Sequence, residues 1–359
     1  MTSRLLTLFG AFATAIAFLG ATPAGQGDAK KTTSPAASAW TLARTPWGDP
    51  DLNGIWGAGY FFTPLERPAK YAGREFLTDA EVAALEKETA ATFGIGGGAG
   101  GNSGRGRPER GTVADVEGAY NDIFSGRGRY AIRTKRTSLI VDPPDGKIPP
   151  LTPEGEKRAA ALRRINTSES GPGGPADDPE QRPPNDRCLG ITLPIAFGVA
   201  ASAGAHSRIV QSAGAVTVYY EHGHHGGVFR TIPLNGGPHL SPSIRQWLGD
   251  PRGRWEDGAL VVDTTNFSDR TNYHGSRENL HLIERFERVQ ADMILYRATV
   301  DDPTTFTRAW TIEVPLTKLD DQKNQIFESA CHEGNYALTS VLAGARLTEK
   351  TAGKKRGVK

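Results

Sequence analysis

The sequence predicts a mainly β protein whose second half forms an antiparallel β-barrel. Three observations point to this fold class. The chain of 359 residues contains 43 glycines and 24 prolines, and such a turn-rich composition favours strands over long helices. After residue 206, short segments of alternating apolar and polar residues follow one another. Tight turns separate these segments, so the strands form a meander, and closing a meander into a barrel removes its exposed edges.

Eight segments in the second half have the apolar alternation of strands and are bounded by turn residues. We expect strands at Ser207–Gln211, Ala215–His222, Val228–Leu234, Leu260–Phe267, Leu280–Val289, Met293–Val300, Phe306–Val314 and Ile326–Cys331.

The first half contains fewer strands. Gly54-Ile55-Trp56 has the Gly-x-Trp form found at the first strand of lipocalin-like barrels, where the glycine lets the tryptophan close the end of the barrel. Arg136–Asp142 predicts one more strand.

Two helices are predicted in the first half. Thr78 is an expected N-cap with Glu81 three residues later, so a short surface helix follows it. Thr152 is the expected N-cap of a second helix, with Pro153 at its first position, that runs to about Ile165.

We divide the chain into five parts. Residues 1–24 are a predicted signal peptide and 25–44 a disordered spacer. Residues 45–187 comprise an arm, short helices, flexible Gly/Pro-rich loops and the first barrel strand or strands. Residues 188–345 form the antiparallel barrel, and 346–359 a basic disordered tail.

The N-terminus predicts export to the periplasm or secretion. Arg4 provides a positive charge, Leu5–Leu19 is apolar, and Thr22-Pro23-Ala24 ends in small residues suited to cleavage. The alternative, an uncleaved anchor helix, needs a longer apolar run than this one. Export exposes the chain to an oxidising compartment, so we predict a disulfide between Cys188 and Cys331, with two separate buried thiols as the alternative.

Charge balance limits the partners. The chain has 42 basic and 40 acidic residues, which gives no electrostatic reason to expect nucleic acid or acidic lipid as a partner. We predict a small-molecule ligand or substrate, no nucleic acid, and no membrane contact after signal cleavage. The oligomeric state is left open.

Charged side chains interrupt the apolar faces of several predicted strands. Arg230, Glu284 and Arg308 each lie at a position whose neighbours two residues away are apolar, and His222 ends the apolar face that contains Tyr220. A buried charge has to be paired or to face a wet cavity. Two interpretations stay open: a structural ion pair of Glu284 with Arg308 or Arg230, and a polar ligand site with groups for proton transfer.

In the functional interpretation, proton transfer is assigned to His222, Glu284 and Asp263, although the face of Asp263 is ambiguous because Leu260 and Val262 are apolar too. The expected substrate-binding residues are Arg230, Arg308, Tyr220, His239, His281 and Trp310.

The histidine-rich stretch provides weak evidence for a metal. His222 and His224 have the His-x-His spacing of several metal sites. Gly226 and Gly227 instead place His224 and His225 in a hairpin turn. We predict no cofactor and keep His222 and His224 as the candidates for a metal.

Well-known catalytic motifs are absent from the sequence. His332-Glu333 lacks the second histidine of a zinc-protease motif, and no Gly-x-Ser-x-Gly elbow, phosphate loop or dinucleotide fingerprint occurs. Catalysis by a Ser/His/Asp triad is therefore unsupported.

Six strings occur in order along the chain: PWGDPDLNGIW, RTSLIVDPPDGKIPPLTPE, SIRQWLGDPRGRWEDGALVVDTTNF, ENLHLIERFERV, TVDDPTTFTRAWT and CHEGNY. Together they resemble a large family of exported bacterial proteins whose function is unknown. The family usually has Trp-Glu-Gly-Asp where this chain has Trp255-Glu256-Asp257-Gly258, and the Gly-rich loop and the His224-His225 turn are peculiar to this chain. The resemblance implies export and a lipocalin-like fold, and it transfers no catalytic residues.

Three functions fit these observations. The first is an exported enzyme that acts on a small organic molecule by acid–base chemistry, as an isomerase, a lyase or hydratase, or a hydrolase. The second is a ligand carrier without turnover, and the third is a structural envelope protein. Convergence of the inward charges on one site, or their complete pairing, separates these hypotheses.

Overall fold

The computed structural model describes residues 40–57, 63–92, 133–166, 176, 178–182, 187–189, 192–194, 206–221, 227–323, 326 and 331–356. The predicted signal peptide and most of the predicted spacer lie outside these residues. Residues 40–44 of the spacer are described, and Arg44 forms an isolated β-bridge with Pro50. Within the described ranges, no helix is both long and apolar enough to cross a membrane.

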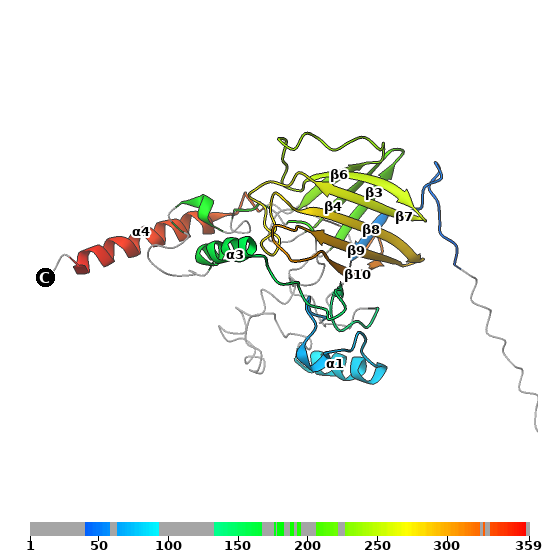
Figure 1. Ribbon diagram of the computed structural model, residues 1–359, viewed down its shortest axis with the longest axis horizontal. Coiled ribbons are helices and arrows are strands. Elements are labelled where there is room, and N and C mark those ends of the chain that lie inside the picture. The colour runs from blue at the N-terminus through cyan, green and yellow to red at the C-terminus, as the bar shows by residue number, and fades with distance from the viewer. Residues whose placement is uncertain are drawn as a thin grey trace, which may run out of the picture. The chain divides into compact units, whose positions relative to one another are not determined.

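The described part of the chain is mainly β, as predicted (Figure 1). Its strands are β1 (Gly54–Gly57), β2 (Ile140–Asp142), β3 (His206–Ser212), β4 (Ala215–Tyr220), β5 (Val228–Pro233), β6 (Asp250–Glu256), β7 (Ala259–Thr265), β8 (His281–Gln290), β9 (Met293–Asp301) and β10 (Trp310–Lys318). Its helices are α1 (Asp79–Thr92), α3 (Pro153–Asn166) and α4 (Tyr336–Arg356), with short 3-10 helices η1 (Ala69–Tyr71) and η2 (Pro179–Gln181).

The strands form a lipocalin-like antiparallel barrel that is nearly closed. Hydrogen bonding connects them in the order β5-β4-β3-β1-β10-β9-β8-β7-β6. Consecutive strands lie side by side from β3 to β5 and from β6 to β10, and β1 joins these two halves because it pairs with both β3 and β10. The short strand β2 pairs with β10 at Thr311 and Ile312, on the edge that β1 uses further along β10. The predicted meander is thus an up-and-down barrel.

The barrel has a seam between β5 and β6, where the described strands share no backbone hydrogen bonds. Because direction alternates at every antiparallel pairing along the order, β5 and β6 run parallel to each other. The connection 234–249 therefore returns to the opposite end of the barrel before β6 begins. Side chains fill the seam, because a Cβ at Gly253 of β6 would lie 2.7 Å from Ile232 Cγ2 and 2.6 Å from Leu234 Cδ2. The missing side chain at Gly253 lets β5 approach β6 closely.

The Gly-x-Trp segment forms strand β1, as predicted. Trp56 is completely buried, and its indole Nε1 donates a hydrogen bond to the Leu52 carbonyl at 2.8 Å. Gly54 has φ +124°, and a Cβ there would overlap the Lys318 side chain. Lys318 Nζ also lies over the Trp56 ring, 5.5 Å from its centroid. The glycine is needed because L-residues with a side chain rarely adopt this φ, whereas the end of the flexible Lys318 side chain could move aside.

The two predicted helices of the first half are confirmed with their caps. At the start of α1, the Glu81 carboxylate accepts from Thr78 N at 2.9 Å, and Glu81 N donates to Thr78 Oγ1 at 3.2 Å. These reciprocal bonds form the predicted capping box. At the start of α3, Gly155 N donates to Thr152 Oγ1 at 3.0 Å, with Pro153 at the first helical position.

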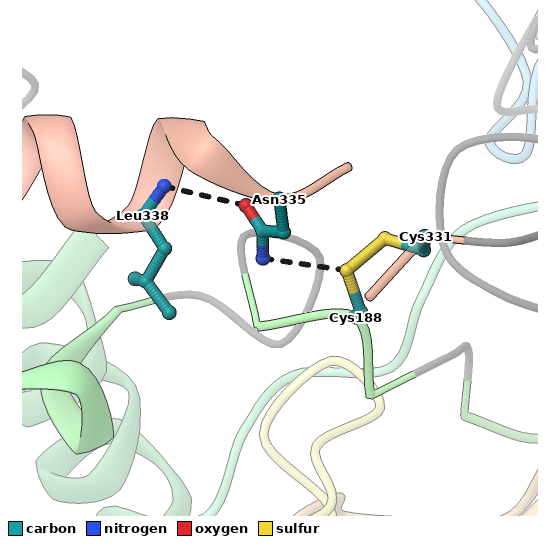
Figure 2. Close-up of a disulfide and its surroundings, with 4 residues drawn as sticks. All are labelled: Cys188, Cys331, Asn335 and Leu338. Atoms are coloured by element: carbon teal, nitrogen blue, oxygen red, sulfur yellow. Dashed lines mark hydrogen bonds between the residues drawn. A yellow bond between two sulfur atoms is a disulfide. The ribbon is translucent and has the colours of Figure 1, made fainter. Parts of the chain in front are cut away.

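The predicted disulfide between Cys188 and Cys331 is present, with Cα atoms 5.7 Å apart (Figure 2). It joins residues 143 positions apart in the chain. Asn335 connects it to α4, because its Nδ2 donates to Cys188 Sγ at 3.4 Å and its Oδ1 accepts from Leu338 N at 3.3 Å. Asn335 thereby caps the N-terminus of α4.

Three predictions about the second half need correction. Strand β6 was not predicted, because Pro251 and Gly253 interrupt its alternation. The last predicted strand, 326–331, falls largely outside the described residues, but Ile326 is not in a strand and Cys331 lies in a turn. The predicted disordered tail is helical as far as Arg356, because α4 continues through it. Its Ala, Leu, Glu and Lys residues are strong helix formers.

Candidate functional site

The inward faces of the strands contain a buried ion pair. Arg230 of β5 donates from Nη2 to Glu284 Oε2 of β8 at 2.5 Å, and the side chains are 3% and 0% exposed. Tyr296 of β9 donates from its hydroxyl to Glu284 Oε1 at 2.8 Å. The Arg230 guanidinium lies 6.0 Å from the Tyr220 ring centroid. The predicted pairing of Glu284 with Arg230 is therefore confirmed.

The phenols beside this pair stay neutral. Burial raises the pKa of Tyr220 to about 12, with the Arg230 charge opposing the rise. Burial and the neighbouring Glu284 carboxylate raise the pKa of Tyr296 well above its ordinary value. Burial is the largest single effect on the pKa of Arg230 and lowers it, but the Glu284 charge and hydrogen bond together with the neighbouring Tyr220 and Tyr296 outweigh burial, so the net shift is upward. The interior thus contains a charged pair between two protonated tyrosines.

The prediction that Arg308 faces inward is wrong. Its side chain is 52% exposed and its Nη2 binds both carboxylate oxygens of Asp142, at 2.8 and 3.0 Å. The alternation from Phe306 to Val314 is not that of one strand, because β10 begins at Trp310. Trp310 itself is completely buried on the inward side.

Other candidates cannot be placed. His222, His224 and His225 lie outside the described residues, so a role for His222 in proton transfer or metal binding stays a prediction. Within the part of the chain that is described, no group of three or more His, Cys, Asp or Glu side chains is arranged to hold a metal ion.

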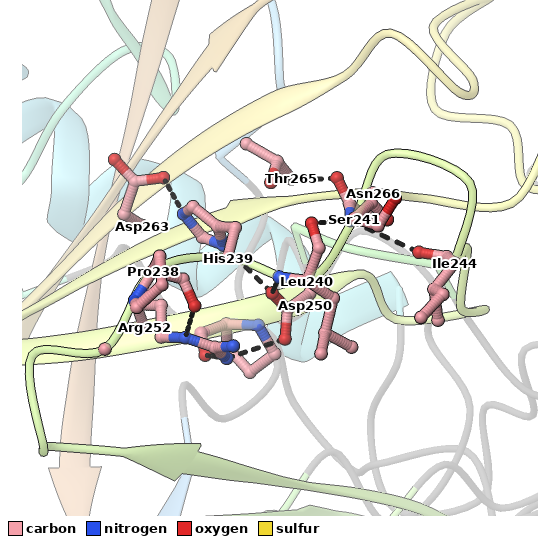
Figure 3. A network of polar contacts seen from close by, with 12 residues as sticks. Pro238, His239, Leu240, Ser241, Ile244, Asp250, Arg252, Asp263, Thr265 and Asn266 are labelled. Carbon is pink, nitrogen blue, oxygen red and sulfur yellow. Dashed lines mark hydrogen bonds and ion pairs between the residues drawn. The ribbon is translucent and has the colours of Figure 1, made fainter.

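A second polar cluster lies on the outer face of β6, β7 and β8 (Figure 3). Leu260, Val262 and Thr264 of β7 are buried, so alternation turns Asp263 outward. Its Oδ1 lies 3.2 Å from His239 Nε2 and 3.0 Å from His281 Nε2. Three residues chosen from the sequence therefore meet at one carboxylate oxygen, on the face of β7 that the sequence left open.

Asp250 completes this cluster. Its Oδ2 lies 3.1 Å from His239 Nδ1 and accepts a hydrogen bond from Leu240 N at 2.8 Å. Its Oδ1 accepts from Arg252 Nη1 at 2.6 Å. Both ring nitrogens of His239 thus lie within hydrogen-bond distance of carboxylate oxygens. His239 belongs to the 234–249 connection and fixes it to the barrel wall.

His281 has a different environment. Its Nε2 is bound to Asp263, and its Nδ1 lies 4.0 Å from Asp301 Oδ2, beyond hydrogen-bond distance. The side chains of His281, His239 and Asp263 are 36%, 30% and 31% exposed, so a molecule in solution can reach them. Asp263 holds one nitrogen of His281 and leaves the other open, which is how a carboxylate orients a histidine base.

Sequence reasoning missed Asp250 and Tyr296. Tyr296 had a usable signal, because its hydroxyl interrupts the apolar face of Ile294, Ala298 and Val300. Asp250 had none, because it precedes Pro251 in a strand without apolar alternation.

The chain was compared with models of known protein families and with curated proteins, and neither comparison gives a match. The resemblance to exported bacterial proteins stays a prediction.

Proposed function

We propose that this protein is an exported enzyme that acts on a small organic molecule by acid–base chemistry at His281. The observation that supports the proposal is the hydrogen bond between His281 Nε2 and Asp263 Oδ1, 3.0 Å long and on a partly exposed face. Export is supported by the predicted signal peptide and by the disulfide, since disulfides persist in oxidising compartments.

In this proposal His281 Nδ1 takes a proton from the substrate or from a water molecule. The Nε2–H bond to Asp263 orients the ring and stabilises the imidazolium that forms. Asp301 lies 4.0 Å from Nδ1 and adds negative charge near the protonated ring. Returning the proton to another atom of the substrate gives isomerisation, and proton removal followed by loss of a leaving group gives elimination. Activation of water gives hydration or hydrolysis.

Asp263 and His239 act as positioning residues. The Asp263 oxygen that binds His281 also lies 3.2 Å from His239 Nε2, so His239 helps to fix the carboxylate that orients His281. Asp250 and Arg252 in turn hold His239 and the start of β6. The cluster is thus preorganised by the 234–249 connection, and His281 needs no rearrangement to accept a proton.

Access favours this outer cluster over the buried pair. Glu284 is 0% exposed and both of its oxygens are hydrogen-bonded, so a substrate reaches it only if the core opens. The buried pair therefore fits the structural interpretation better than proton transfer.

The proposal is tested with purified mature protein and a small-molecule extract of bacterial cells, followed by mass spectrometry. The wild type is expected to consume at least one compound. His281→Ala should slow this conversion about 100-fold or more, the usual contribution of a general base. His332→Ala is the matched control, because His332 is exposed and lies outside the cluster.

Two results contradict the proposal. The first is equal conversion by wild type and His281→Ala, and the second is a compound that remains bound to the wild type without being changed. The second result supports the carrier hypothesis. Metal analysis of the same sample identifies a metalloenzyme directly.

A further inference from the structure

One end of the barrel interior contains buried polar groups that have no hydrogen-bond partner. They are Trp310 Nε1, Thr264 Oγ1, Tyr273 Oη, and the Nε and Nη1 atoms of Arg230. Trp310 and Thr264 are completely buried, and Arg230 is 5% exposed. Buried polar groups are nearly always paired in folded proteins, so several orphans in one region require an explanation.

These groups lie at one level of the barrel. The register pairs Trp310 with Val300, Val300 with Leu282, and Leu282 with Thr264, so Trp310 and Thr264 occupy one row across four strands. Glu284 is the next inward-facing residue of β8 after Leu282, and Arg230 lies beside this row because it binds Glu284. The Tyr273 ring stacks on Trp310, with centroids 5.9 Å apart.

The chemistry of these groups defines the partner. An indole N–H and a guanidinium N–H can donate a hydrogen bond and cannot accept one. The hydroxyls of Thr264 and Tyr273 donate as well, and burial raises the pKa of Tyr273, so its phenol keeps the proton. All four groups are therefore complementary to an acceptor, such as a carboxylate or a carbonyl.

The surroundings of Trp310 are aromatic and reach the surface. Phe306 and His274 meet the Trp310 ring edge-on, with centroids 5.7 and 5.9 Å away. Tyr273 contacts His274 at 4.8 Å. Exposure rises along this series, from buried Trp310 through half-buried Tyr273 to exposed His274. A planar ring stacks or packs edge-on favourably in such surroundings.

We propose that this end of the barrel binds a small planar organic acid, with its acceptor oxygens on Trp310 Nε1 and Tyr273 Oη and its ring among the aromatic side chains. Thr264 in the same row and Arg230 beside the next inward position of β8 provide further donors. The site is separate from His281, which lies on the outer face of β8, and it does not depend on the proposed enzymatic activity.

The test uses benzoate as the probe and benzylamine as its control. Benzylamine has the same aromatic ring, but it carries a hydrogen-bond donor, the ammonium group, where benzoate carries the acceptor carboxylate. Ligand-dependent shifts of the melting temperature and calorimetric titration are measured on the full mature protein. Benzoate should raise the melting temperature with the logarithm of its concentration above Kd, and benzylamine should not. Trp310→Phe and Tyr273→Phe keep the ring and remove one donor, so each should weaken benzoate binding about 3- to 10-fold.

Trp255→Phe is the matched control. Trp255 Nε1 is also buried without a partner, but Trp255 is paired with Leu260, two inward positions along β7 from Thr264. This variant and His281→Ala should bind benzoate as the wild type does. Equal effects of Trp255→Phe and Trp310→Phe, equal binding of both probes, or no binding of benzoate would overturn the proposal. A crystal structure with ordered water alone on these donors at saturating benzoate would do so as well.

Discussion

Arg230 Nη2 on β5 lies 2.5 Å from Glu284 Oε2 on β8, and this ion pair reaches across the seam of the barrel. β5 and β6 share no ladder in the described structure, and Glu284 lies on the second strand beyond β6. The side-chain bond therefore connects β5 and β8 directly across the seam. Backbone hydrogen bonds link these two strands only through the other strands of the barrel. Tyr296 of β9 donates a hydrogen bond to the same Glu284 carboxylate, so a third strand is connected to the pair.

We predict that Glu284→Gln destabilises the fold by about 3–5 kcal/mol, because it leaves the Arg230 charge buried without a counter-charge. Urea denaturation at neutral pH measures this change. Replacing both residues with methionine should recover much of the loss, because no charge then remains in the core.

The exposed pair of Arg308 and Asp142 is the control for this prediction. Asp142→Asn should change the free energy of unfolding by about 1 kcal/mol at most, as expected for an exposed ion pair. If Glu284→Gln is no more harmful than Asp142→Asn, the pair does not brace the barrel.

Gly253 leads to a second prediction about the seam. A methyl group there would meet Ile232 and Leu234 at under 3 Å, so Gly253→Ala should cost about 1–3 kcal/mol of stability through overpacking. Gly334→Ala is the control, because a Cβ at Gly334 meets nothing within 4 Å. Thermal unfolding compares the two variants, and equal melting temperatures would show that β5 and β6 do not pack tightly.

The barrel was predictable because its strands repeat one physical pattern. Arg230 and Glu284 interrupt otherwise apolar inward faces, so a period of two residues identified both of them. The same reasoning failed for Arg308, because an irregular segment before Trp310 happens to continue the alternation. It also missed β6, where Pro251 fits the strand start and Gly253 fits the seam without leaving an apolar signal.

The sequence identified the residues of the outer cluster but did not predict that they form one site. Asp263, His239 and His281 were all chosen, yet nothing in the sequence placed them together. Asp263 and His281 meet because β7 and β8 are neighbours, whereas His239 joins them through the path of the 234–249 connection, which follows from the parallel seam. The number of strands in the barrel and the parallel direction of β5 and β6 at the seam are properties of the whole barrel. No local sequence pattern encodes them.

Asp302 gives a prediction about pH. Burial alone would raise its pKa, but hydrogen bonds from Ser276, Thr305 and Thr304 outweigh burial and lower the pKa below 3.8. The folded state therefore favours the ionised form, and its stabilisation is present above the unfolded pKa and is lost as pH falls through the folded pKa. Asp302→Asn should cost about 1–3 kcal/mol at pH 7.

The cost of Asp302→Asn should shrink at low pH, once the wild-type carboxyl is also protonated. Melting temperatures of the wild type and the variant are compared at pH 7 and in acid solution. Parallel curves with a constant difference would show that ionisation of Asp302 contributes nothing to stability.

The disulfide leads to the last prediction, because it is attached to α4 through Asn335. None of the side chains described for residues 336–351 of α4 is buried, so the helix has little packing to stabilise it. Cys188→Ser with Cys331→Ser should lower stability by about 3–5 kcal/mol and speed hydrogen exchange throughout α4. Asn335→Ala, which keeps the disulfide and removes the cap, should cost about 1 kcal/mol and affect the first turn of α4 most. Unchanged exchange in α4 after loss of both cysteines would mean that contacts such as Arg346 with the Ala176 carbonyl hold the helix instead.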